Sequence, residues 1–241
     1  MDILFKSDNH SNIIFSDFGE GDMIQSNQNL IFHEKSGLLI DPGGIRVYKN
    51  LYEKVSQTLP VENIKHIFLS HQDPDIVSSL NGWLMVTDAT AYISDFWIRF
   101  ITHFWVDSTA IERIKPIDDK GMILNCCSCD ISIIPAHFLH SAGNFQVYDS
   151  ESKILYTGDL AASFGAPYKM TENFETHIQY IEKFHKRMMG SLNAINSWKK
   201  KIENFDIDMI VPQHGAVIKG KNEVKKFIKW AGNTPCGSDL L

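Results

Sequence analysis

The sequence predicts a mixed α/β protein in which sheet layers are covered by helices. Two observations predict this fold class. Strand-like and helix-like segments alternate along the chain, and 44% of its 241 residues are hydrophobic, enough for a substantial core without disulfides. No low-complexity linker or tandem repeat interrupts the pattern. We therefore expect a single domain over residues 1–241.

The expected elements follow one another from the N-terminus. Two short apolar runs, 29–32 and 37–40, flank a polar turn and predict a hairpin. Apolar residues at helical spacing cover 46–58, and Pro60 ends that helix. The other expected elements are a strand at 64–69, helices at 74–84, 95–106, 172–205 (which Gly190 and Ser191 can interrupt) and 222–230, and strands near 131–139, 144–149, 153–157 and 208–212.

Charge and composition make several classes of partner unfavourable. The chain has 23 Lys+Arg against 29 Asp+Glu, a net charge of −6, which argues against nucleic acid or an anionic membrane. The most apolar region, 83–105, contains Asp88, Asp95 and Arg99, so no membrane insertion is expected. The N-terminus lacks the layout of a signal peptide, and the four cysteines do not resemble a secreted disulfide framework. These features predict a cytoplasmic protein.

Four predicted strands each end in a side chain that can bind a metal. The residues at these strand ends are His71, Asp73 and Asp75 after 64–69, His140 after 131–139, Asp159 after 153–157 and His214 after 208–212. Loops beyond strand ends are where a rigid sheet presents several chemical groups to one point. Two carboxylates as close in sequence as Asp73 and Asp75 would repel each other without a cation. The sequence therefore predicts a metal site.

The same motifs resemble, in order, the signature of the metallo-β-lactamase superfamily. They are Asp-Pro-Gly at 41–43, Ser-His-x-Asp-x-Asp at 70–75, His-Ser-x-Gly at 140–143, Thr-Gly-Asp at 157–159 and Pro-x-His-Gly at 212–215. The resemblance covers roughly residues 20–220. It implies a four-layer αββα sandwich, with two packed sheets, helices outside and a binuclear site at one edge.

Departures from the pattern of zinc hydrolases indicate the branch of the superfamily. Those hydrolases usually carry His-x-His-x-Asp-His, whereas here Asp73 replaces the second His and Ile76 stands at the last position. The result resembles the flavo-diiron proteins. That resemblance implies one iron held by His71, Asp73 and His140, a second held by Asp75 and His214, and Asp159 as the bridge, with an Fe–O–Fe or hydroxo link. Mixed His/Asp sites suit iron or manganese, and three Asp with one hydroxide neutralise two Fe(II).

The resemblance also implies a function. Flavo-diiron reductases continue into a domain that holds FMN, but only 241 − 214 = 27 residues follow His214 and no Gly-rich phosphate loop is present, so no bound flavin is expected. The chain most resembles the stand-alone oxygen-binding di-iron proteins linked to bacterial chemotaxis. That group implies a stable peroxide-level dioxygen adduct, a role as oxygen or iron sensor, a chemotaxis signalling partner and a homodimer. Two alternatives remain open: an O2 or NO reductase fed by separate flavodoxin- or rubredoxin-like donors, and a binuclear metal-dependent hydrolase.

Other side chains carry weaker signals. His137 and His185 are candidates for orienting a metal ligand, although a packed structural role is the simpler interpretation of each. The cysteines at 126, 127 and 129 suggest a soft-metal or redox site, but no motif His lies near them in sequence, which favours small buried residues. The aromatic group Phe96, Trp97, Phe100, Phe104 and Trp105 predicts core or dimer packing, or the lining of an O2 pocket.

Overall fold

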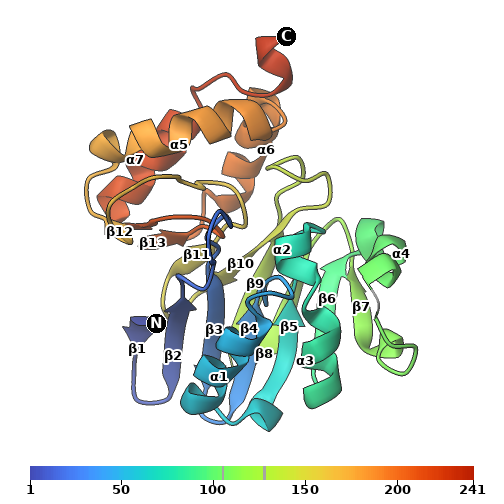
Figure 1. Cartoon of the computed structure of the whole chain (residues 1–241). Coiled ribbons are helices and arrows are strands. Elements are labelled where there is room, and N and C mark those ends of the chain that lie inside the picture. Colours follow the sequence, from blue (N-terminus) through green and yellow to red (C-terminus); the bar gives the residue numbers. More distant parts are fainter. Residues whose placement is uncertain (105, 127–128) are drawn as a thin grey trace. The chain divides into compact units, whose positions relative to one another are not determined.

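The computed structural model describes residues 1–104, 106–126 and 129–241, and its contacts divide the chain into two compact units, Met1–Ile131 and Ser132–Leu241. Two residues weighed above, Trp105 and Cys127, lie outside the described residues. Each unit has its own strands, helices and hydrophobic core (Figure 1). The predicted mixed α/β class is confirmed, while the expectation of one domain over 1–241 stays a prediction.

The first unit contains a seven-stranded sheet in which neighbouring strands follow sequence order. Its strands are β1 (Asp2–Lys6), β2 (His10–Phe15), β3 (Gln28–His33), β4 (Ser36–Ile40), β5 (Ile64–Phe68), β6 (Thr90–Ser94) and β7 (Ile114–Ile117), and β8 (Met122–Cys126) follows them in the chain. The pairs from β1 to β4 are antiparallel, and those from β4 to β7 are parallel. Parallel pairing sends the carboxyl ends of β4, β5 and β6 to the same edge of the sheet.

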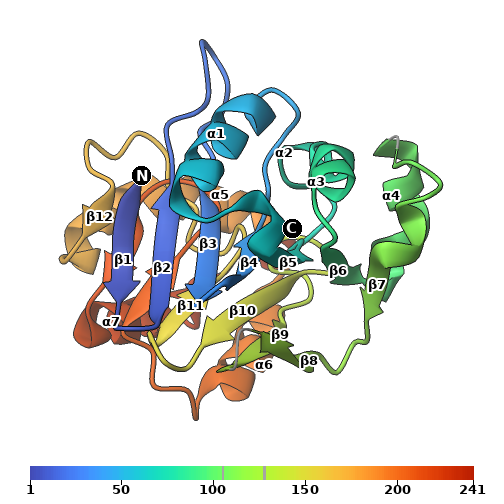
Figure 2. The ribbon, with the colours of Figure 1, turned by 90° about the horizontal axis from the view of Figure 1, so that it is seen from below.

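The helices of the first unit bury short apolar faces. They are α1 (Tyr48–Thr58), α2 (Pro74–Val77), α3 (Leu80–Val86) and α4 (Ile98–Ile101), with 3-10 turns η1 (Val61–Asn63), η2 (Asp95–Trp97), η3 (Thr102–Phe104) and η4 (Ile111–Arg113). Figure 2 shows α1 and α3 on the same side of the sheet. Leu51 and Val55 of α1 share the core with Trp83 of α3. The hydroxyl of Tyr48 donates to the carbonyl of Gly82 at 3.1 Å, which fixes the two helices together.

Two of the predicted helices are shorter than the sequence indicates. The expected helix 74–84 is divided between α2 and α3, because the amide of Ser79 donates to the carbonyl of Gly43 at 3.3 Å rather than within the helix. The buried Ser79 hydroxyl also donates to the carbonyl of Pro42 at 3.0 Å. The expected helix 95–106 contains only the four residues of α4 between 3-10 turns. Strands β1, β2, β6, β7 and β8 were not predicted. In β2 the polar residues His10 and Asn12 are as buried as the apolar ones, so the strand lacks the usual alternation.

The second unit contains a sheet in the order β12-β14-β13-β11-β10-β9. These strands are β9 (Cys129–Pro135), which crosses the boundary between the units, β10 (Phe145–Asp149), β11 (Ile154–Tyr156), β12 (Met170–Thr171), β13 (Met209–Val211) and β14 (Val217–Lys219). Strands β11 and β13 are parallel, with Tyr156 opposite Val211. Their carboxyl ends therefore lie at the same edge of the sheet, where the loops that carry Asp159 and His214 begin.

Helices α5 (Phe174–Met188), α6 (Leu192–Ile202) and α7 (Lys221–Ala231) belong to this unit, with a final turn η5 (Ser238–Leu240). The expected helix 172–205 is interrupted at Gly190 and Ser191, where the Ser191 hydroxyl accepts from the amide of Ala194. Helices α5 and α7 lie side by side (Figure 1), and the ring of Phe174 contacts those of Phe227 and Trp230. Within the described ranges no helix combines the length and apolar character needed to cross a bilayer.

We predict that His185 makes the folded chain sensitive to acid. Burial, with a smaller effect of the Lys186 charge, lowers the pKa of His185 to about 4, whereas the unfolded residue titrates near 6.5. The unfolded chain binds the proton first, so the stabilising effect is complete above about pH 6.5 and is lost as the pH falls toward 4. Between about pH 8 and pH 5 the loss should be on the order of 2 kcal/mol.

Urea unfolding of His185→Leu in chelator at several pH values measures this contribution. The variant should show a correspondingly flatter pH dependence than the wild type. His103→Leu is the control, because His103 is exposed. Parallel wild-type and His185→Leu profiles would contradict the assignment.

Candidate metal centre

In the first unit, a buried carboxylate organises the end of β5. The register pairs Ile40 with Phe68, and the amide of Asp41 donates to the carbonyl of Phe68 at 2.8 Å. The Asp41 side chain then accepts from the amide of Ser70 at 2.7 Å through Oδ1. Asp41 is thus a structural residue that joins two parallel strand ends just before His71. This explains why an Asp-Pro-Gly turn precedes the first histidine motif.

The side chain of Ser70 sets the orientation of the His71 ring. Its hydroxyl lies 3.0 Å from His71 Nδ1, and the residue His71 is 1% exposed. Nε2 then lies 3.5 Å from Asp73 Oδ2. That separation is long for a hydrogen bond, but it suits two ligand atoms that share one cation at about 2.1 Å each.

Asp73 and Asp75 lie at the N-terminal end of α2. The Asp73 side chain makes no capping hydrogen bond, and Nε2 of the Gln72 side chain donates to its Oδ1 at 2.9 Å. Asp75 occupies the first turn and is half-buried. Ile76, which stands where zinc hydrolases carry a histidine, is fully buried in the core of this unit. The first unit therefore supplies one imidazole and two carboxylates.

In the second unit, backbone hydrogen bonds join the loops after β11 and β13. The amide of Gln213 donates to the carbonyl of Gly158 at 2.8 Å, and that of Ser163 donates to the carbonyl of His214 at 3.1 Å. Asp159 and His214 are consequently held beside each other by the main chain. Both residues are buried.

Asp159 directs its two carboxylate oxygens at two different imidazoles. Oδ1 lies 3.6 Å from His214 Nε2, and Oδ2 lies 3.8 Å from His140 Nε2. Both separations exceed hydrogen-bond length. A carboxylate with one oxygen facing each imidazole has the geometry required of a ligand that bridges two cations.

Asn144 positions the loop that carries His140. Its buried side-chain amide donates to the carbonyl of Leu139 at 2.8 Å, and its backbone carbonyl accepts from Ala136 at 2.9 Å. The loop is closed further by the amide of Phe138, which donates to the carbonyl of Ser141. The sequence reasoning missed Asn144, and only its place four residues after His140 could have drawn attention to it.

Known proteins resemble this chain in sequence and in fold. A family model described as ODP family beta lactamase matches residues 24–215. The chain belongs to this family. The predicted membership of the metallo-β-lactamase superfamily is therefore confirmed, and so is its fold class.

Solved structures extend the likeness over the whole chain of this ODP family member. A structure described as the peroxy diiron species of chemotaxis sensor ODP is 36% identical with a TM-score of 0.89, covering 100% of this chain and 98% of that one. A variant of the flavo di-iron protein from Thermotoga maritima has 18% identity and a TM-score of 0.78, covering 92% and 58%. An uncharacterized protein of Methanocaldococcus jannaschii is 24% identical over 84% of this chain, which spans about half (52%) of that curated relative.

Two phenyl rings in the second unit lie beside the imidazoles. The Phe164 ring centre is 5.7 Å from that of His214 and 5.1 Å from that of Phe184, which in turn is 6.3 Å from His140. Neither ring was predicted from the sequence. The aromatic group at 96–105 was predicted to form core or dimer packing or to line an O2 pocket, and its Phe96 and Phe100 are more than half exposed.

His137 and His185 are packed against aromatic rings. His137 meets Phe145 edge-on at 5.2 Å and lines a cavity of about 520 Å³. His185 is buried against Trp230 with 4.7 Å between ring centres. A role of either residue in orienting a ligand stays a prediction.

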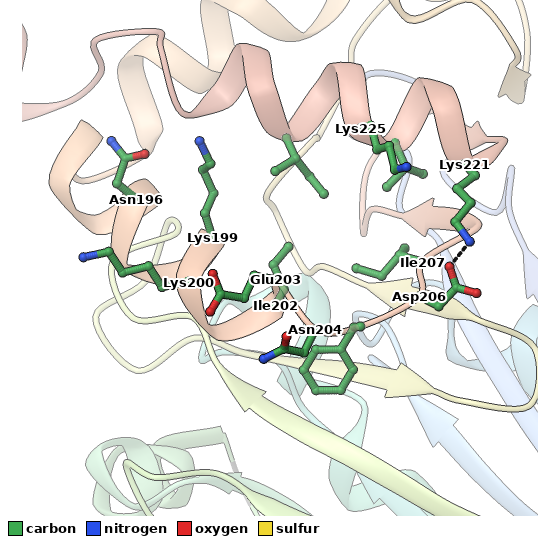
Figure 3. Close-up of a pocket in the computed structure, with 13 residues that line it drawn as sticks. Asn196, Lys199, Lys200, Ile202, Glu203, Asn204, Asp206, Ile207, Lys221 and Lys225 are labelled. Atoms are coloured by element: carbon green, nitrogen blue, oxygen red, sulfur yellow. Dashed lines mark ion pairs between the residues drawn. The ribbon is translucent and has the colours of Figure 1, made fainter.

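A larger groove of about 760 Å³ lies between the end of α6 and the start of α7 (Figure 3). Lysines 199, 200 and 225 line it together with apolar side chains such as Ile202 and Ile207, and Lys221 pairs with Asp206. Lys153 and Lys221 together lower the pKa of Asp206 to about 2. None of the six candidate ligands lines this groove, so it is separate from the metal centre.

We predict that Gly215→Ala damages the loop that carries His214. Gly215 has a φ of +81°, and an added Cβ would collide with the carbonyl and hydroxyl oxygens of Ser163. The collision and the strained φ together should lower the free energy of unfolding by about 2 kcal/mol or more, measured by urea unfolding, and should reduce metal content.

Gly165 is a matched control with a φ of +78° and no atom within 4 Å of the added Cβ. Gly165→Ala should cost only about 1 kcal/mol and keep the metal. Equal losses for both variants would refute the steric account.

Proposed function

We propose that this protein binds dioxygen at a di-iron centre and acts as a sensor of oxygen or iron. The observation that carries the proposal is the orientation of the Asp159 carboxylate. One of its oxygens faces His140 and the other faces His214. The 36% identical relative described as a peroxy diiron chemotaxis sensor supports it over the whole length of the chain. The proposed ligand set also fits the donor chemistry that iron prefers.

The six motif residues would divide between two irons. His71 and Asp73 of the first unit with His140 of the second would hold one iron, Asp75 and His214 would hold the other, and Asp159 would bridge them. Three carboxylates and three imidazoles form a harder donor set than the nitrogen and sulfur sites that zinc favours. When bound, two ferrous ions supply the two electrons needed to take dioxygen to the peroxide level.

The residues of the chain orient and enclose this centre. Ser70 contacts Nδ1 of His71, so Nε2 remains the ligand atom. Asn144 holds the His140 loop in place. Phe164 and Phe184 place hydrocarbon beside the two imidazoles of the second unit.

We extend the proposal to the surroundings of the sensor. A chemotaxis signalling protein would read the state of the centre, the chain would act as a homodimer, and the compartment would be the cytoplasm. The described cysteines Cys126, Cys129 and Cys236 are free thiols, as a reducing compartment allows. A separate electron donor is required only by the reductase alternative.

The first test measures iron and its response to oxygen. Protein loaded anaerobically with Fe(II) should contain two irons per chain and develop a long-lived visible absorption band when it is mixed with O2. Immediate formation of a featureless oxidised product would count against a sensor. Continuous O2 or NO consumption with a reduced flavodoxin or rubredoxin would indicate a reductase, and zinc with esterase activity would indicate a hydrolase.

The second test removes the proposed bridge. Asp159→Asn keeps the size of the side chain but loses its charge, so iron content should fall from two per chain to one or none. Asp149→Asn is the matched control, because Asp149 is also buried but its oxygens accept from Ser152 and the amide of Glu151. The control should keep both irons. Two irons in Asp159→Asn would contradict the bridging role.

A further inference from the structure

A second group of metal-binding side chains lies in the first unit, away from the motif loops. His10 of β2 and His33 of β3 are directly opposite each other in the antiparallel pair. Residues paired in this way project from the same face of the sheet. Their ring centres are 5.7 Å apart.

Cys129, the first residue of β9, completes this group. Its sulfur and one nitrogen of each imidazole all lie within 4.8 Å of one another. His10 is fully buried, while His33 and Cys129 are half-buried. The group is thus anchored on one side and open to solvent on the other.

We propose that His10, His33 and Cys129 form a site for a borderline-soft divalent cation, zinc above all. Two imidazole nitrogens with one thiolate are the donors that zinc takes in proteins, and three protein ligands leave a fourth position for water. Tetrahedral zinc needs ligand atoms about 3.3–3.6 Å apart, so side-chain rotations of roughly 1 Å close the site. None of the three residues belongs to the proposed iron centre, and the inference does not depend on that centre.

Binding exchanges a proton for the metal. The thiol of Cys129 now donates to the carbonyl of Cys126 at 3.1 Å. On binding, the sulfur–hydrogen bond breaks, its electron pair forms the sulfur–zinc bond, and the proton leaves to solvent. No oxidant or reductant is required. The bound ion would fasten the β2–β3 ladder to the start of β9.

Cobalt(II) titration of the metal-free chain tests this site, because a thiolate bound to Co(II) produces a near-ultraviolet charge-transfer band. The proposed iron ligands include no cysteine, so the band distinguishes a cysteine site from the iron centre. The wild type should show it with a stoichiometry of one per chain, with zinc displacing the cobalt. A wild-type titration without the band would overturn the proposal before any variant is made.

Variants then identify the ligands. Cys129→Ser should abolish the band and lower total cobalt by one per chain, and Cys236→Ser should change neither. His33→Gln should weaken cobalt binding at least tenfold, whereas His66→Gln, which alters another half-buried histidine of this unit, should not. A band that survives in Cys129→Ser would refute the assignment. His10 is left unaltered, since its complete burial makes it a risk to folding.

Discussion

Hydrogen bonds between the ends of parallel strands hold the candidate ligands in both units. In the first unit Asp41 links the end of β4 to the amide of Ser70, and His71 follows directly. In the second unit the bond from Gln213 to Gly158 places His214 and Asp159 side by side. Fixing a loop before a ligand arrives reduces the entropy lost on binding. The chemistry of the centre therefore depends on strand pairing more than on any single side chain.

The sequence was informative where a strand and a ligand are neighbours in the chain. Strand ends before His71, Asp159 and His214 were predicted because apolar runs, turn residues and ligand types stand next to one another. Asn144, Phe164 and Phe184 were missed because each acts through contacts made only after folding. Helix 74–84 was predicted as continuous because the hydrogen bond from the amide of Ser79 to the carbonyl of Gly43 joins residues far apart in the sequence.

The cysteine cluster is a second case in which the sequence alone could not identify neighbouring residues. Sequence reasoning set Cys126, Cys127 and Cys129 aside because no motif histidine stands near them in the chain. Folding places His10 and His33 within reach of Cys129 by pairing two strands from the beginning of the sequence. His10 lies in no recognisable pattern, since β2 is buried throughout and carries no polar–apolar alternation, and His33 follows the apolar run of β3 without a motif of its own. Only the register of the sheet identifies them as neighbours.

If Asp159 bridges the proposed iron pair, its burial would connect the cell's iron supply to the stability of each copy of the protein. A carboxylate that is 4% exposed is stabilised by a positive charge beside it, which a bound cation would supply. Cations bound only by the folded chain add to its stability in proportion to the logarithm of their free concentration. Chains made during iron scarcity would open more often and meet proteases sooner. Abundance itself would then follow metal supply, independently of any conformational signal.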